Sequence, residues 1–185
     1  MFFFDENNDN LTFSSRSVEH AYVAILEDDL RVAQAVFESI DSPRAKWGKA
    51  LVDILLGYVE KYPSYFEIRN FLEIDLDFLL KNKKIDYVEQ LLGALEVLVS
   101  INQETYKYVA RVMFENRLYK VAREYLEKSK NIFYNDPELH FIYAKFYLKS
   151  REYELADYHL DECLKILPDY FPAKALQREI SRYLV

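Results

Sequence analysis

Glycine and proline are scarce in this chain, which has 3 glycines and 5 prolines among 185 residues. Sandwiches and barrels of β-strands need many turns, and those turns are rich in both residues. The composition therefore argues against an all-β fold and favours helices joined by short loops. Hydrophobic residues make up 51% of the chain, so a sizeable core can be buried.

Cysteine and long hydrophobic runs are also lacking. The single cysteine, Cys163, excludes a disulfide within the chain and fits a reducing compartment. No stretch approaches the roughly 18 uncharged apolar residues of a membrane helix. Residues 1–4 are apolar, but no basic residue precedes them and Asp5 and Glu6 follow at once, unlike a secretory signal. We therefore expect no membrane span and a cytoplasmic location.

Negative charge is concentrated in the first half of the chain. The formal net charge is −7, and residues 1–92 carry all of it, with 17 acidic and 10 basic residues. Residues 93–185 have 14 of each sign and are neutral. An acidic chain repels phosphate groups, so we expect no nucleic-acid partner. The acidic half can attract a basic partner.

Patterns of catalytic residues are missing as well. Gly48, Gly57 and Gly93 are isolated, so there is no glycine-rich phosphate loop, and no G-x-S-x-G, H-E-x-x-H or C-x-x-C occurs. Neighbouring carboxylates such as Asp75 and Asp77 have no candidate nucleophile, base or cofactor loop beside them, so a solvated acidic face is the simpler interpretation. We expect a protein that is not an enzyme and holds no cofactor.

Only one group of residues suggests a metal. His140 and His159 fall on consecutive predicted helices, Cys163 lies one turn beyond His159, and a carboxylate such as Asp136 could complete a zinc site. The simpler interpretation places Cys163 in the core, where cysteine behaves as a small hydrophobe. We expect no metal.

Hydrophobic spacing and capping residues predict about ten helices after a loose N-terminal arm at residues 1–14. Asp136 followed by Pro137, for example, predicts the start of a helix, because aspartate caps the first turn and proline suits its first position. The predicted helices are 15–28, 30–40, 43–61, 65–81, 86–99, 102–116, 119–133, 137–149, 153–167 and 171–184.

A repeated pattern runs through the second half of the chain. In the copy at 137–170, His140, Tyr143, Ala144 and Tyr147 follow the spacing W-x2-L-G-x2-Y, and further matches are Ala156, Leu160 and Pro168. One period upstream, the same positions hold Tyr106, Val109, Ala110, Met113, Ala122 and Leu126. This pattern resembles the tetratricopeptide repeat, a helix–turn–helix unit of about 34 residues. Its small residues should lie where two helices cross closely.

The resemblance implies an all-α fold, an α-solenoid of helix hairpins closed by a C-terminal capping helix at 171–185. Residues 15–185 would form one helical-repeat domain, with repeats at 69–102, 103–136 and 137–170. The helices within 15–62 are irregular. The predicted third helix has no partner, so it either forms one unit with the fourth or is an insertion.

The resemblance also implies a binding groove, because the first helix of each unit lines the concave surface in this family. The groove would be acidic at Glu73 and Asp77 and then basic, with aromatic and aliphatic residues among the charges. The remaining groove residues are Lys107, Arg111, Phe114, Phe141, Lys145, Leu148 and Lys149. Such a surface suits an acidic peptide. Alternatively, Glu73 and Asp77 pair with Lys107 and Arg111 and bind nothing.

The expected function is a non-catalytic scaffold for protein–protein interaction that holds a peptide segment of a partner in this groove. One alternative is a small secretion or assembly chaperone that cradles an apolar client segment. Another is a self-associating structural protein, since the ends of a solenoid expose apolar faces and a homodimer is possible.

Overall fold

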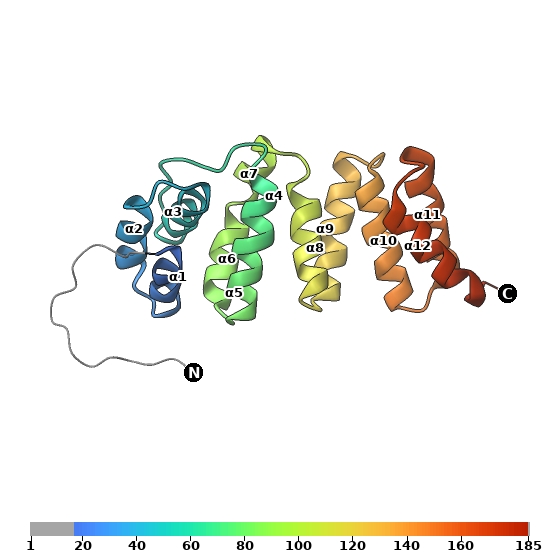
Figure 1. Ribbon diagram of the computed structural model, residues 1–185, viewed down its shortest axis with the longest axis horizontal. Helices are drawn as coiled ribbons and strands as arrows, with labels where there is room; N and C mark the ends of the chain where they lie inside the picture. The colour runs from blue at the N-terminus through green and yellow to red at the C-terminus, as the bar shows by residue number, and fades with distance from the viewer. Residues whose placement is uncertain (1–16, 185) are drawn as a thin grey trace. The chain divides into compact units, whose positions relative to one another are not determined.

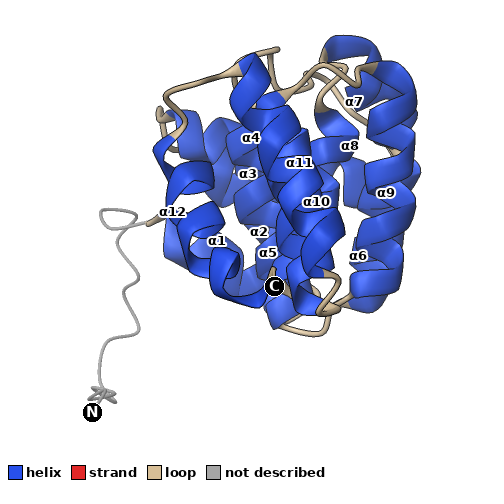
Figure 2. Ribbon diagram, turned by 90° about the vertical axis from the view of Figure 1, so that its right-hand side faces the viewer, coloured by secondary structure: helices blue, strands red, loops and turns tan. Residues whose placement is uncertain are grey.

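The described part of the chain is all-helical. A computed structural model describes residues 17–184, and every regular element in that range is a helix (Figure 1). Figure 2 shows these helices joined mostly by short loops, with no strand among the described residues. The all-α prediction is confirmed. No helix within 17–184 is long and apolar enough to cross a membrane.

The chain divides into two compact units, with the boundary between Tyr62 and Pro63. This boundary coincides with the end of the irregular segment 15–62 that the sequence set apart. A single domain over 15–185 stays a prediction. The predicted arm at residues 1–14 lies outside the described residues.

The first unit contains three helices, α1 (Val18–Leu26), α2 (Leu30–Glu38) and α3 (Pro43–Leu55). The side chains of Ser17, Asp29 and Ser42 cap their first turns by accepting backbone N–H bonds. Each of the three helices packs against the other two. The third helix, which the sequence could not assign, therefore belongs to one compact unit with the first two, and the fourth helix belongs to the other unit.

The C-terminal end of α3 was predicted wrongly. The helix ends at Leu55, not at residue 61, because Gly57 adopts a left-handed conformation with φ of 82°. The N–H groups of Gly57 and Tyr58 donate to the carbonyls of Ile54 and Asp53, at 3.1 and 2.9 Å. This pattern closes a helix end and stops its propagation.

The second unit begins with a helical column that consists of α4 (Ile68–Phe71), the π-helical turn η1 (Leu72–Leu76) and α5 (Asp77–Lys81). The next predicted helix, 86–99, is in fact two helices separated at Ala94, just after Gly93, a residue of low helix propensity. The remaining helices of the unit are α6 (Ile85–Gly93), α7 (Leu95–Ile101), α8 (Thr105–Glu115), α9 (Tyr119–Ile132), α10 (Pro137–Lys149), α11 (Tyr153–Ile166), α12 (Phe171–Ile180) and the 3₁₀ turn η2 (Ser181–Tyr183).

Helix pairs pack through small residues in this unit. The pair α8 and α9 and the pair α10 and α11 form the closest packing, and α8 also contacts η1 and α10. Ala110 and Ala122 in the first pair, and Ala144 and Ala156 in the second, are all fully buried. The prediction that these small residues lie inside the helix pairs is confirmed.

The turns within successive helix pairs share one backbone geometry. Lys83, Arg117 and Arg151 have positive φ of 58°, 63° and 62°, and they follow one another at intervals of 34 residues. At each turn two N–H groups bond back to the preceding helix. At Arg117, for instance, its own N–H donates to Phe114 and that of Leu118 to Met113, at 3.0 and 2.9 Å. The chain thus closes these helices with ordinary residues where glycine is usual.

Candidate functional site

The predicted groove residues separate into two groups, of which the first is an internal network of ion pairs. Lys107, on α8, is almost fully buried, with 4% of its side chain exposed. Its ammonium group bonds to the carboxylates of Glu104 and Asp136, the former at 2.7 Å, and lies 3.4 Å from Glu138. Burial by itself would lower the pKa of Lys107, but the bonds to Asp136 and Glu104 outweigh burial and raise it.

Asp136 has two roles in this network. One carboxylate oxygen accepts the N–H bonds of Glu138 and Leu139, at 2.8 and 3.2 Å, and so caps α10 as predicted. The other oxygen accepts from Lys107 of α8. The same side chain therefore starts one helix and ties it to another.

Arg111 completes the network. Its guanidinium donates to Glu138 at 2.6 Å and to Glu73 at 3.2 Å, and Arg69 bonds to the same two carboxylates at 2.9 and 3.2 Å. Arg69 and Glu73 come from α4 and η1, Arg111 from α8 and Glu138 from α10, so the ion pairs join three neighbouring helical segments. The alternative that Glu73 pairs with Arg111 thus describes the structure.

Asp77 pairs elsewhere. It bonds to Lys81 at 2.6 Å and accepts a hydrogen bond from the amide of Asn116 at 2.8 Å. It contacts neither of the two cations that the sequence suggested for it. Glu73, Asp77, Lys107 and Arg111 are thus all engaged by partners within the chain.

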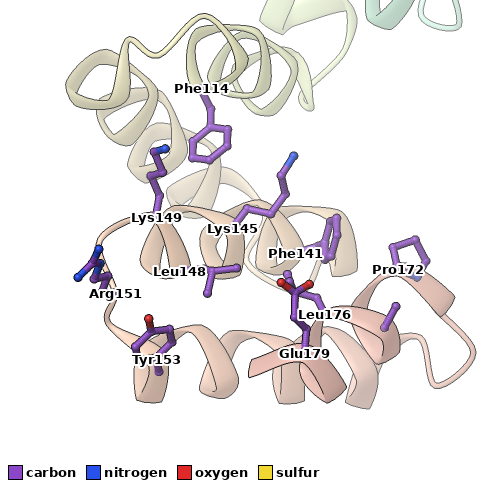
Figure 3. Close-up of a pocket in the computed structure, with 11 residues that line it drawn as sticks. Phe114, Phe141, Lys145, Leu148, Lys149, Arg151, Tyr153, Pro172, Leu176 and Glu179 are labelled. Atoms are coloured by element: carbon purple, nitrogen blue, oxygen red, sulfur yellow. The ribbon is translucent and has the colours of Figure 1, made fainter. Parts of the chain in front are cut away.

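The second group of predicted residues lines an open cavity of about 580 Å³. Figure 3 shows the lining side chains, which come from α8, α10, α12, the start of α11 and the turn after α10. The predicted residues among them are Phe114, Phe141, Lys145, Leu148 and Lys149. These five residues, which were predicted from the sequence, form the side of the cavity that α8 and α10 provide.

The residues on the opposite side of the cavity were not predicted from the sequence. Pro172, Ala175, Leu176 and Glu179 of α12 line the cavity, together with Arg151 and Tyr153. The sequence treated α12 only as a cap for the last repeat. Nothing in the sequence marked these residues, because the exposure of Ala175 and the half-burial of Leu176 are known only from the packed structure.

Positive charge surrounds the apolar centre of this cavity. The residues that line the cavity include three cations, Lys145, Lys149 and Arg151, and one carboxylate, that of Glu179. Within residues 17–184 none of the three cations forms an ion pair with a carboxylate. The amino group of Lys145 lies 5.3 Å from the centre of the Phe114 ring, a cation–π distance. The cavity therefore combines apolar surface with cations that form no ion pair with any carboxylate of residues 17–184.

The histidine group considered for a metal lies in the core between α10 and α11. The Nδ1 atoms of His140 and His159 are 3.0 Å apart, and Tyr143 and Tyr147 stack on the His159 ring. Burial raises the pKa of the Cys163 thiol to about 11, so it is protonated at neutral pH. Among the described residues, no three histidine, cysteine or acidic side chains are placed to hold a metal ion.

Neither models of known protein families, nor curated proteins, nor solved structures match this chain.

Proposed function

We propose that this protein is a non-catalytic protein–protein interaction module, built as an α-solenoid of tetratricopeptide-like helix hairpins. Support for the repeat comes from the 34-residue interval between Lys83, Arg117 and Arg151, which matches the period read from the sequence. The buried alanines of the two regular hairpins also support it. The cytoplasmic location stays a prediction from composition.

The observation that carries the proposed binding role is the cavity between α8, α10 and α12, which has an apolar centre and cations that form no ion pair among residues 17–184. Its volume of about 580 Å³ is typical of ligand sites. The ligand it suits is a protein segment with an aromatic or aliphatic side chain next to acidic residues. The apolar side chain would supply affinity and the acidic residues would select the partner.

The proposed binding surface is smaller than the groove predicted from the sequence. Lys107 and Arg111 belong to the internal ion-pair network, so their role is to hold α8 and α10 together. Lys145, Lys149 and Arg151 are then the cations that meet the partner.

Peptide binding tests the proposal. We would measure the fluorescence anisotropy of labelled peptides in which one or two aromatic residues are flanked by Asp and Glu. We expect Lys145→Glu/Lys149→Glu to weaken binding at least tenfold, because two attractive charges become repulsive. The matched control is Lys120→Glu/Lys165→Glu, the same charge change at exposed positions that do not line the cavity, which should retain binding. Equal affinities for the two variants would place the site elsewhere.

A further inference from the structure

The N-terminal segment of the chain carries the chemistry that the cavity suits. Phe2, Phe3 and Phe4 are followed at once by Asp5 and Glu6, and a further acidic residue stands at position 9. No basic residue occurs before position 16. The segment lies outside the described residues, so its match to the cavity depends on its amino-acid sequence and on the residues that line the cavity.

The apolar side of the match comes from the centre of the cavity. Phe141, Leu148 and Leu176 are each only partly buried, and Phe114 stands above them on α8 (Figure 3). Aromatic rings prefer edge-to-face and offset contacts with other rings, which Phe114 and Phe141 offer. Phenylalanine side chains entering this space would cover apolar surface that is now in contact with water.

The charged side of the match comes from the rim. Lys145, Lys149 and Arg151 outnumber the single carboxylate of Glu179, and the N-terminal segment has only acidic charges up to position 15. In an extended segment, successive side chains point to opposite sides. Phenylalanines can therefore enter the cavity while the adjoining carboxylates reach the cations at its rim.

We propose that the cavity binds residues 2–9 of a second copy of this chain. The inference rests on the proposed function and names its partner. The segment and the cavity are different surfaces, so a pair joined by one such contact keeps a free cavity on one copy and a free segment on the other. A contact of this kind is heterologous and leads to assemblies that grow with concentration.

The first test isolates the segment. A labelled peptide of residues 1–10 is titrated with the full chain carrying Phe2→Ser/Phe3→Ser/Phe4→Ser, so that the chain's own segment does not compete. We expect saturable binding, and at least tenfold weaker binding when Lys145→Glu/Lys149→Glu is added. A peptide with serine in place of its three phenylalanines should not bind. Absence of saturable binding by the unaltered peptide would overturn the inference.

The second test asks whether a second copy supplies the segment. Sedimentation velocity of the wild-type chain should show a mass that rises with concentration, and Lys145→Glu/Lys149→Glu should keep the chain monomeric. Asp5→Lys/Glu6→Lys alone should do the same, and combining the two charge reversals should restore assembly. A wild-type chain that stays monomeric at all concentrations overturns the inference, as does failure of the combined reversal to restore assembly.

These tests distinguish failure of the inference from failure of the proposed function. If the peptide of residues 1–10 fails but unrelated acidic aromatic peptides bind in a manner that depends on Lys145 and Lys149, the inference falls and the proposed function stands. If no acidic aromatic peptide binds, both fall. Retained assembly in Lys120→Glu/Lys165→Glu is the control for nonspecific effects of charge.

Discussion

Lys107 illustrates how one buried charge can join helices that are separate in the sequence. Its ammonium group contacts carboxylates of its own helix and of α10, including the residue that caps α10. Removing one partner of a buried ion pair leaves the other charge without compensation. From the sequence, the same residue was predicted as one of several residues of the binding groove, with internal pairing as the alternative.

We predict that Lys107→Met lowers the free energy of unfolding by roughly 3–5 kcal/mol, because Asp136 and Glu104 would stay charged without their cation. Lys165→Met is the control, since Lys165 is 69% exposed and pairs with Glu162 at the surface. Exposed pairs contribute about 0–1 kcal/mol. Urea denaturation measures both values, and similar losses for the two variants would contradict a special role for Lys107.

His159 should make stability depend on pH. Burial lowers the pKa of His159 to about 4, helped by the nearby charges of His140 and Lys130 and opposed by Glu162. Below pH 6.5 His159 becomes protonated in the unfolded chain, whereas in the folded chain it becomes protonated only below about pH 4. The contribution of His159 to the free energy of unfolding is therefore fully present above pH 6.5. It falls by about 3 kcal/mol as the pH drops from 6.5 to 4.

The measurement is the free energy of unfolding in urea at several values between pH 7 and pH 4. We expect His159→Gln to be less stable at pH 7 but to lose less stability on acidification than the wild type, because glutamine does not titrate. An unchanged pH dependence in His159→Gln would contradict the assignment.

At the scale of the elements, the hairpin turns carry strain. Arg117 closes α8 with φ of 63°, a left-handed conformation that non-glycine residues adopt at some energetic cost. We predict that Arg117→Gly stabilises the chain by roughly 0.5–1 kcal/mol, after allowing for the greater freedom of glycine in the unfolded chain. Lys120→Gly, three residues later but inside α9, should instead destabilise by about 1 kcal/mol. Thermal and urea unfolding would show opposite signs, and a loss of stability in Arg117→Gly would refute the argument.

The helix ends show which local signals the sequence carries. The start of α10 was predicted because Asp136 and Pro137 act within one turn of the chain. The ends at Leu55 and Gly93 were missed although a glycine lies at or near each, since hydrophobic spacing continued past them. The left-handed turns at Lys83, Arg117 and Arg151 could not be read, because these residue types do not mark that conformation.

At the scale of the whole molecule, the contacts gather within two units. A change inside one unit should therefore act mainly on that unit. Gly48 provides the test, because a Cβ atom built on it would lie 2.3 Å from two ring atoms of the buried Phe37. Overpacking of this kind costs about 1–3 kcal/mol.

We predict that Gly48→Ala speeds amide hydrogen exchange throughout α1–α3 and leaves exchange in α8–α11 unchanged. Gly93→Ala is the control, since nothing lies within 4 Å of its added Cβ and alanine favours helix. Exchange is followed by mass spectrometry at neutral pH. Faster exchange in both units of Gly48→Ala would show that they unfold together.

The sequence by itself determined the all-helical fold, most helix boundaries and the buried alanines of the hairpins, because helix spacing and capping act between residues a few positions apart. The groove residues predicted from the sequence also include one side of the cavity, formed by Phe114, Phe141, Lys145, Leu148 and Lys149. Only the tertiary structure decided which charged side chains pair with one another within residues 17–184. Lys107 meets Asp136, 29 residues away, and Arg111 meets Glu73, 38 residues away, across packed helices. Such pairings depend on which helix faces lie together, and local sequence does not encode that arrangement.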